Sequence, residues 1–295
     1  MLSKYAFDPE DHENFYRYPE AAYIKPFRIF GNLYYVGNQD AGAHLIDTGD
    51  GLILIDTTYP TTAALLVNSI WEIGFRIQDI KMILHSHGHF DHFGATALIK
   101  TLSGAKTYLG EADALMFREH PELALIECNR HSYLELFTPD VEMKNDDLIS
   151  LGHTVIRVLS TPGHSAGTMS FFTEVVESGN KLTAGMFGGS GLNTLCQEFI
   201  VEHNLTESRT QFVTSLERLK LEKVDIVLGN HAPQNNTVAK RKHMLGQPDA
   251  SNPFIDQSEW LDMLDRVRAW YENMLTEEAH GTDQINKPGG VAYDD

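Results

Sequence analysis

The sequence predicts a mixed α/β domain in which two β-sheets are enclosed by helices. Two observations predict this class: strand and helix patterns alternate twice along the chain, and short meanders of strands stand between them. A third observation concerns position, since three segments that contain histidine each follow the end of a predicted buried strand. Loops at strand ends can converge on one site while the strands hold them rigid.

The first half of the domain begins with a β-rich stretch. Its predicted strands span residues 33–36, 44–46, 52–55, 82–84 and 106–109, and its predicted helices span 60–74 and 94–102. Residues 52–55 form a continuous apolar run, which is typical of a strand buried on both faces. In the helix over 60–74, Pro60 suits the first turn and Gly74 suits the C-terminal cap.

The second half repeats the pattern and ends in a long helix. Its predicted strands span residues 154–159, 168–173, 182–186 and 224–228, and its predicted helices span 206–221 and 257–275. The last helix has an apolar stripe at helical spacing, made by Trp260, Leu264, Val267, Tyr271 and Met274. Asp256 and Glu259 predict a capping box at its start.

Length, charge and cysteine content exclude several classes of protein. A chain of 295 residues is long enough for a large core, and no apolar run approaches the roughly 18 residues of a membrane span. The chain has 23 Lys and Arg against 41 Asp and Glu, a net charge of −18. Phosphate backbones and anionic lipid would repel this surface, so neither nucleic acid nor a membrane is an expected partner. Two cysteines exclude a disulfide scaffold and a cysteine-based zinc finger.

We expect three parts of the chain: an N-terminal arm over residues 1–26, a single domain over 27–280 that includes the C-terminal helix, and a polar tail over 281–295. The start of the chain lacks the apolar core of a secretory signal. This predicts a cytoplasmic location, or a periplasmic or secreted one if a leader was removed. The oligomeric state stays open, as does whether Cys128 and Cys196 are bridged.

The first histidine segment offers four metal ligands within six residues. His87, His89, Asp91 and His92 supply three imidazoles and a carboxylate, which suit Zn²⁺ or another borderline first-row ion. Two-residue spacing brings the first three together, whereas His92 must point elsewhere, so one loop can supply two metal sites. A merely hydrophilic turn is the alternative, but the run is interrupted by Gly and Phe and follows a buried strand.

The two later segments each contribute one histidine. Pro162 and Gly163 predict a tight turn that lifts His164 off the end of a strand. His231 follows Gly229 and Asn230 at the end of the next buried strand. Either segment alone would be a weak signal.

Together the three segments resemble the metallo-β-lactamase superfamily. The run His87-Gly88-His89-Phe90-Asp91-His92 matches the His-x-His-x-Asp-His signature of that family, and the similarity extends from about Phe27 to Arg241. The resemblance implies an αββα four-layer sandwich with the metals at one edge of the β-core.

Carried over residue by residue, the resemblance implies two Zn²⁺ ions. One would be held by His87, His89 and His164. The other would be held by Asp91, His92 and His231. Asp56, at the end of the strand over 52–55, matches a family aspartate that supports the metal loop from behind.

The absence of a carboxylate at one expected ligand position indicates which subclass of the family the chain resembles. Many superfamily hydrolases carry a bridging Asp at the position of Met186, and no carboxylate lies between Lys181 and Leu195. Neither cysteine is well placed to replace a ligand. The remaining pattern resembles subclass B3. The serines that bind the substrate carboxylate in that subclass are not clearly present, and Ser190 and Asn193 are the polar candidates for substrate binding.

The resemblance implies a zinc-dependent hydrolase of the B3 type that opens a β-lactam ring by attack of a zinc-bound hydroxide, oriented by Asp91. The expected partner is a small anionic substrate. The alternative is a dizinc lactonase or esterase-like hydrolase with weak or no β-lactamase activity. A zinc protein that has lost catalysis is disfavoured by the complete ligand set, and a nuclease by the acidic surface. We expect a mobile flap at residues 120–147 or in the N-terminal arm with Phe15, Tyr16 and Tyr18.

Overall fold

The computed structural model describes residues 18–128, 134–247 and 250–280. The first of two sheets has seven strands in the order of the chain: β1 (Phe27–Phe30), β2 (Leu33–Tyr35), β3 (His44–Asp47), β4 (Leu52–Ile55), β5 (Ile80–Leu84), β6 (Lys106–Gly110) and β7 (Val141–Met143). Strands β1 to β4 pair antiparallel, and β4 to β7 pair parallel.

The second sheet has five strands in the order β12-β11-β10-β9-β8. Their bounds are β8 (Leu148–Leu151), β9 (Thr154–Ser160), β10 (Met169–Glu177), β11 (Asn180–Phe187) and β12 (Ile226–Gly229). Only β11 and β12 pair parallel, and the other neighbours are antiparallel.

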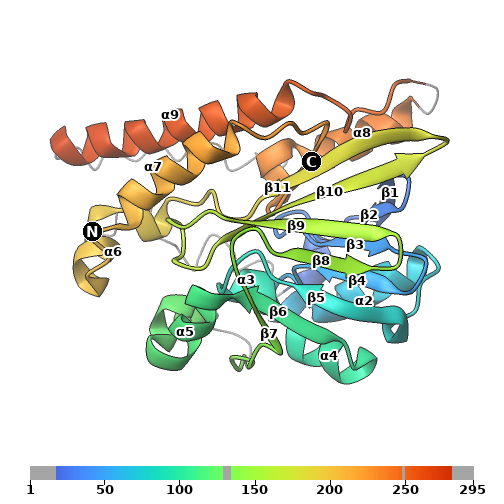
Figure 1. Ribbon diagram of the computed structural model, residues 1–295, viewed down its shortest axis with the longest axis horizontal. Coiled ribbons are helices and arrows are strands. Elements are labelled where there is room, and N and C mark those ends of the chain that lie inside the picture. Colours follow the sequence, from blue (N-terminus) through green and yellow to red (C-terminus); the bar gives the residue numbers. More distant parts are fainter. Residues whose placement is uncertain (1–17, 129–133, 248–249, 281–295) are drawn as a thin grey trace.

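Helices cover the outer faces of both sheets. The α-helices are α2 (Ala63–Glu72), α3 (Phe90–Phe93), α4 (Thr96–Ser103), α5 (Glu111–Glu119), α6 (Gln197–His203), α7 (Ser208–Leu219), α8 (Thr237–Gly246) and α9 (Glu259–His280). Short 3-10 turns are η1 (Pro19–Ala22), η2 (Pro60–Thr62), η3 (Ile77–Asp79), η4 (Pro121–Ala124), η5 (Ile126–Cys128), η6 (Asn193–Leu195) and η7 (Ala232–Asn235). Figure 1 shows α7 and α9 above the five-stranded sheet and α4 at the opposite, lower side of the molecule.

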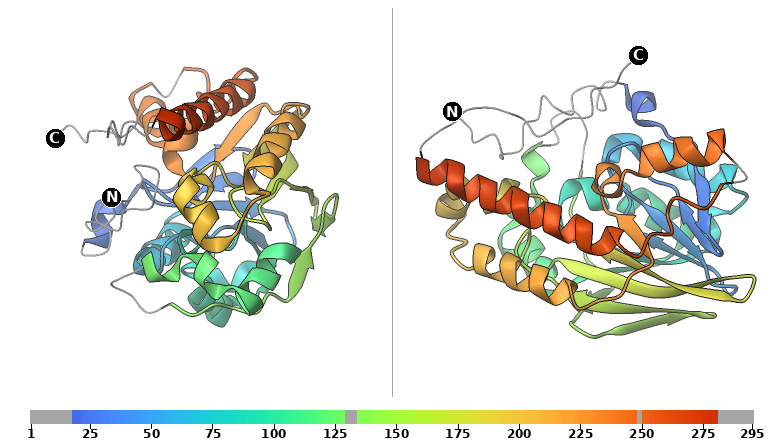
Figure 2. Two further views of the ribbon diagram at one scale, coloured as in Figure 1. Left: turned by 90° about the vertical axis from the view of Figure 1, so that its left-hand side faces the viewer. Right: turned by 90° about the horizontal axis from the view of Figure 1, so that it is seen from above.

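Three layers of buried apolar side chains lie between the two sheets and the helices that cover them. The layer between the sheets joins buried side chains such as Ile53, Phe171 and Met186. A second layer joins α7 and α9 to the five-stranded sheet, and both helices run along the same face of the molecule (Figure 2). A third joins α2 and α4 to the seven-stranded sheet. The predicted αββα sandwich is therefore confirmed.

The strand ends that carry the histidine segments meet at one edge of the sandwich. The carboxyl ends of β4 and β5 lie together because these strands are parallel, and the same holds for β11 and β12. The β9–β10 connection shares that edge because β10 is antiparallel to both of its neighbours. Backbone hydrogen bonds join the two sheets here, from Met169 N to Ser86 O (2.7 Å) and from Gly42 N to Asn230 O (2.7 Å).

Most predicted elements are confirmed, with shifted ends. The hairpin of β10 and β11 and the helix α9 are longer than predicted. The sequence reading missed β1, β7, β8, α3, α5, α6 and α8. In α5 the buried side includes the carboxylate of Asp113, so an apolar stripe is a poor guide to that helix.

The predicted capping box at the start of α9 is wrong. Glu259 forms an ion pair with Lys240 of α8 instead of reaching back to Asp256. The Asp256 carboxylate accepts hydrogen bonds from the Ser258 backbone (2.9 Å) and hydroxyl (2.8 Å). A partner from a distant helix thus replaces the local one, which the sequence pattern could not indicate.

Residues 120–147 are in part a component of the first sheet, because they contain β7. Leu123, Leu125 and Phe137 of this segment pack on the apolar cluster around α3 and α5. Phe15 and Tyr16 lie outside the described residues, and Tyr18 is exposed. A flap at either place stays a prediction, as do the domain limits at residues 26 and 280.

Two further sequence expectations concern cysteine and membranes. Cys196 is a buried free thiol, whereas the side chain of Cys128 lies outside the described residues. Among the helices that the structure describes, none has the length and apolar character needed to span a bilayer.

Candidate metal centre

The histidine-rich loop is anchored where it leaves β5. His85 is buried, with Nδ1 2.8 Å from the Tyr108 carbonyl oxygen and Nε2 2.7 Å from the Thr96 hydroxyl. The loop then passes His87 and His89 and enters α3, a single turn that carries Asp91 and His92. Through α3, Asp91 and His92 come to lie beside His231 as well as beside His87.

The first cluster contains His87, His89 and His164, all buried. His164 Nε2 lies 3.0 Å from His89 Nδ1 and 3.2 Å from His87 Nε2. The turn after β9 therefore brings His164 to the β5 loop, from a position far along the chain. These are the residues that the resemblance assigned to one zinc ion.

The second cluster contains Asp91, His92 and His231. His231 Nε2 lies 3.2 Å from His92 Nε2 and 3.3 Å from Asp91 Oδ2, and His92 Nε2 lies 3.4 Å from the same oxygen. These are the residues assigned to the other zinc ion. His87 also lies within ligand distance of Asp91 and His92, so the two clusters adjoin.

The partners of the outer ring nitrogens fix which atoms face inward. His164 Nδ1 is 2.9 Å from the Gly191 carbonyl, which can only accept, so this nitrogen carries the hydrogen and Nε2 has a bare lone pair. The Ser86 hydroxyl donates to Asp56 Oδ2 (2.7 Å) and so accepts from His87 Nδ1 (3.1 Å). The two Nε2 lone pairs then face each other at 3.2 Å. A cation between them removes the repulsion, so the donor set fits a metal ion.

The second cluster has the same arrangement with carboxylates behind the rings. His92 Nδ1 is 2.9 Å from Asp56 Oδ2, and His231 Nδ1 is 3.3 Å from Asp40 Oδ1. Each carboxylate accepts from the outer nitrogen and leaves Nε2 facing Asp91. Hydrogen bonds of this kind orient a metal-binding imidazole and increase its basicity.

The pKa values of the histidines shift in opposite directions in the two clusters. Burial, followed by the neighbouring histidines, holds the pKa of His87 and of His89 well below the ordinary value. Burial also lowers the pKa of His164 to about 4. These rings are therefore neutral and can donate lone pairs at neutral pH.

In the second cluster the carboxylates outweigh burial. Burial lowers the pKa of His92, but Asp91 and Asp56 beside it raise that pKa to about 9. Burial likewise opposes charge on His231, yet Asp40 and Asp91 hold its pKa well above the ordinary value. The same negative charge that favours a proton on these rings favours a metal cation in its place.

Asp56 lies where the resemblance expects a supporting residue. Its φ of 58° is in the left-handed region, which Asp tolerates better than most residues. Besides His92, its carboxylate accepts from the Ser86 backbone N–H at 2.7 Å. Asp56 thus supports both clusters. It hydrogen-bonds to His92 of the second cluster directly, and it reaches His87 of the first cluster through the Ser86 hydroxyl.

Asp113 of α5 is a functional candidate that the sequence reading missed. It is fully buried and accepts three hydrogen bonds of 2.7 Å, from Gly88 N, Gly167 N and the Ser165 hydroxyl. Burial raises the pKa of Asp113, and these hydrogen bonds oppose the shift. Because Gly88 follows His87 and Gly167 lies in the same loop as His164, Asp113 ties the two loops of the first cluster together. No sequence spacing indicates this link.

The glycines after β11 allow a close approach to His164. A Cβ at Gly189 would lie 2.8 Å from His164 Cδ2, and one at Gly191 would lie 2.9 Å from His164 Cε1. The Gly-rich run thus forms the wall against which the imidazole rests. Met186, at the position expected for a bridging carboxylate, is buried in the apolar layer between the sheets.

The predicted substrate contacts lie in two adjoining cavities. Asn193 lines a cavity of about 160 Å³ together with Asp91, His164 and His231, and Tyr59 and Leu125 are also part of its wall. Ser190 lies in a neighbouring cavity that also reaches His231, and its hydroxyl accepts a hydrogen bond from Gln234 Nε2 (3.0 Å). Both candidates therefore lie near the clusters but in different places.

Comparison with known proteins shows what this fold and site are similar to. The family model described as the metallo-beta-lactamase superfamily matches residues 41–176, which include five of the six candidate ligands, all but His231. A subclass B3 metallo-beta-lactamase of Bradyrhizobium japonicum, BJP-1, is 26% identical with a TM-score of 0.76, over 88% of this chain and 97% of that one. The FEZ-1 metallo-beta-lactamase of Legionella gormanii is 29% identical with a TM-score of 0.77, over 87% of this chain and 97% of that one.

Similarity among curated sequences is more partial. An N-acyl homoserine lactonase of Bacillus thuringiensis is 28% identical over 172 residues, which cover 49% of this chain and 62% of the lactonase. The chain spans between about half and two thirds of the length of the first curated relatives it matches. The predicted resemblance, including its B3 character, is confirmed by the structural matches.

Proposed function

We propose that this chain, which belongs to the metallo-β-lactamase superfamily of hydrolases, is a dizinc hydrolase of the B3 type that opens the β-lactam ring. One observation carries the proposal. Two adjoining three-ligand clusters stand at the edge of the sandwich, and the strand end that bears the bridging Asp in many related hydrolases has Met186 and glycines instead. Similarity to B3 enzymes over nearly the whole chain supports it.

The zinc ligands in this proposal are His87, His89 and His164 for one ion, and Asp91, His92 and His231 for the other. Bound zinc would lower the pKa of a water toward neutrality and polarise the scissile carbonyl. The neutral rings of the first cluster supply lone pairs without charge. The Asp91 carboxylate, at the wall of the 160 Å³ cavity, would accept a hydrogen bond from the attacking water and orient it toward the substrate.

The cavity walls exclude water and position a small substrate in this proposal. Tyr59 and Leu125 contribute an apolar rim, and Asn193 contributes an amide that can hydrogen-bond a carbonyl. A second cavity of about 310 Å³ continues past His89 and His164. Its apolar lining, from Leu115, Met116 and Phe199, suits the acyl substituent of the substrate.

A second candidate function is hydrolysis of a lactone or another ester. The similarity to the homoserine lactonase favours it, and so does the apolar cavity beside His164, which could take an acyl chain. The missing carboxylate at Met186 counts against it.

Steady-state kinetics of the zinc-loaded protein discriminates the two. The substrates are a chromogenic cephalosporin, a penicillin, a carbapenem and an acyl-homoserine lactone, and an Asp91→Asn variant is the control for contaminating activity. We expect turnover of at least one β-lactam that the control loses. Turnover of the lactone alone would refute the first function in favour of the second.

A further inference from the structure

Tyr59 links the wall of the 160 Å³ cavity to the second ligand cluster. Its hydroxyl donates a hydrogen bond to Asp40 Oδ2, and Asp40 Oδ1 lies 3.3 Å from Nδ1 of His231. The two oxygens of one carboxylate therefore hold two different partners. On the far side of the imidazole, His231 Nε2 lies 3.3 Å from Asp91 Oδ2. A chain of contacts thus runs from the tyrosine to the place that a metal ion would occupy.

The backbone around Asp40 is paired with the backbone around His231. The Ala232 N–H donates to the Asp40 carbonyl oxygen (2.6 Å). Ala41 and His231 form an isolated antiparallel β-bridge. The Asn38 side chain fixes the turn itself, because its Oδ1 accepts from the N–H groups of Asp40 and Ala41, both at 2.8 Å. The backbone therefore brings the Asp40 carboxylate to the ring, and the hydrogen bonds of that carboxylate set its direction.

Tyr59 is placed by the turn that follows β4. Thr58 has a φ of 59°, in the left-handed region, which is unusual for a β-branched residue. Two backbone hydrogen bonds to the segment of α3 hold this turn. The Thr57 N–H donates to the His92 carbonyl oxygen, and the Gly94 N–H donates to the Thr58 carbonyl oxygen, both at 2.8 Å. Strained backbone of this kind persists where the surroundings fix it, and it clusters at functional sites.

The ring of Tyr59 is buried and lies on the metal loop. Its centroid is 5.7 Å from that of Phe90, the residue before Asp91 in α3. Both rings belong to an apolar cluster that also contains Ala41. An apolar ring alone would fill this position, so what the hydroxyl adds is the hydrogen bond to Asp40.

We propose that Tyr59 is a positioning residue for the second metal ion, because it holds the Asp40 carboxylate and thereby orients His231 toward that ion. A carboxylate that accepts from Tyr59 with one oxygen has fewer orientations open to it, and its other oxygen then faces His231 Nδ1. Hydrogen-bond partners behind a metal-binding imidazole fix the ring and increase metal affinity. The inference rests on the second zinc ion of the proposed function and adds a residue beyond the carboxylates that contact the rings.

Chelator competition on Tyr59→Phe tests the proposal. We expect the affinity for one zinc ion to fall about 3- to 10-fold, somewhat less than the loss of a group in direct contact with a ligand, and the other affinity to stay unchanged. Tyr23→Phe is the matched control. It removes a tyrosine hydroxyl that also donates to a carboxylate, that of Glu72 (2.7 Å), at an exposed place on α2. Both zinc affinities should be those of the wild type in this control.

A double-mutant cycle with Asp40→Ala separates positioning from packing. If Tyr59 acts through Asp40, adding Tyr59→Phe to Asp40→Ala should weaken zinc binding by less than about twofold. An equal loss in both backgrounds would show that the hydroxyl acts independently of Asp40, and this would overturn the proposal. So would wild-type affinity for both ions in Tyr59→Phe with unchanged circular dichroism.

The imidazole signals of His231 and His164 keep this inference separate from the proposed function. Proton–nitrogen correlation NMR of the zinc-loaded protein follows Nδ1–H of both rings. Tyr59→Phe should shift or broaden the His231 signal and leave that of His164 in place, because His164 Nδ1 contacts the Gly191 carbonyl instead. This result would support the link even if the wild type bound one zinc ion or hydrolysed no β-lactam, which would refute the proposed function. Unchanged signals of both rings would refute the link, whatever the metal content and the activity.

Discussion

The two ligand clusters of the candidate centre are held by different forces. The first, His87, His89 and His164, consists of neutral rings supported by a hydroxyl and a carbonyl. The second, around Asp91, has two more carboxylates behind its rings. The first should therefore depend on the geometry of backbone and loops, whereas the second should depend on charge.

The largest expected effect comes from removing one ligand of each cluster. His164→Ala and His231→Ala should each lose about one equivalent of zinc and lower kcat/KM at least about a thousandfold, because metal assistance contributes several kcal/mol to the reaction. Metal analysis after dialysis and steady-state kinetics measure both effects. Retention of two equivalents in either variant would contradict the division into clusters.

Asp113→Asn tests whether the first cluster depends on a link between loops. The amide cannot accept from all three donors, so at least one buried N–H or O–H loses its partner. We expect the free energy of unfolding of the metal-free protein to fall by about 2–4 kcal/mol, measured by urea denaturation. Asp265→Asn, which alters only an exposed pair with Lys220, is the control and should change it by less than about 1 kcal/mol.

Asp40→Asn tests the role of charge in the second cluster. Loss of the carboxylate behind His231 should weaken binding of one zinc ion about 10- to 100-fold and leave the other unchanged. Competition with a chromogenic chelator resolves the two affinities. Equal weakening of both ions would mean that the clusters do not differ as proposed.

The smallest effect is expected where only the backbone wall of the first cluster is altered. The added methyl group of Gly189→Ala must displace the His164 ring, which we expect to weaken one zinc ion about tenfold. Gly246→Ala is the control, because a Cβ there meets nothing within 4 Å. A Gly189→Ala protein with wild-type zinc affinity at both sites would show that the wall does not set the position of His164.

The two clusters also differ in how far the sequence predicted them. The contiguous run from His87 to His92 is visible because one loop places its ligands at fixed spacing. His164 and His231 needed the resemblance, since each stands alone in its loop. Asp113 and Asp40 gave no signal, because their roles arise from contacts between segments far apart in the chain.

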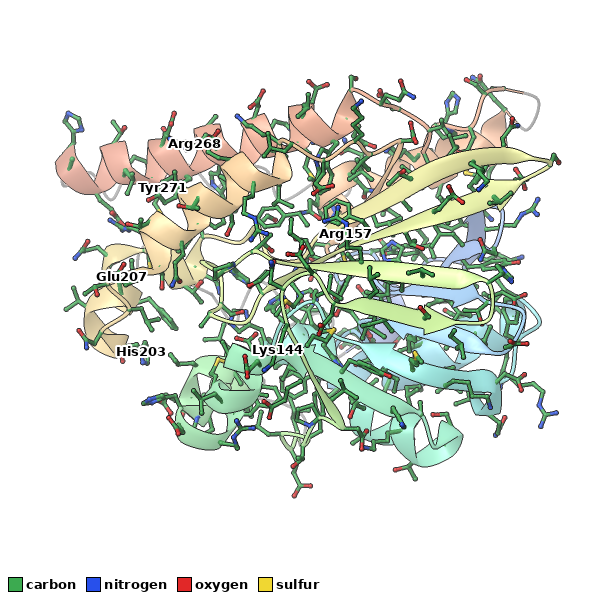
Figure 3. The ribbon with its side chains drawn as sticks, in the orientation of Figure 1. Lys144, Arg157, His203, Glu207, Arg268 and Tyr271 are labelled. Atoms are coloured by element: carbon green, nitrogen blue, oxygen red, sulfur yellow. The ribbon has the colours of Figure 1, made fainter. Side chains whose placement is uncertain are left out.

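The sequence by itself predicted two sheets enclosed by helices and the candidate ligands of the loop from His87 to His92, because strand patterns, turn residues and ligand spacing are local properties of the chain. The tertiary structure decided which carboxylates stand behind which rings, and that Met186 is part of the core. It also decided that Arg266 of α9 lines a cavity, whereas Arg268 of the same helix, labelled in Figure 3, pairs with Glu217 and Glu272. These features depend on how elements far apart in the chain pack together, because that packing sets the burial and the charge of the side chains at the site. No local sequence pattern encodes it.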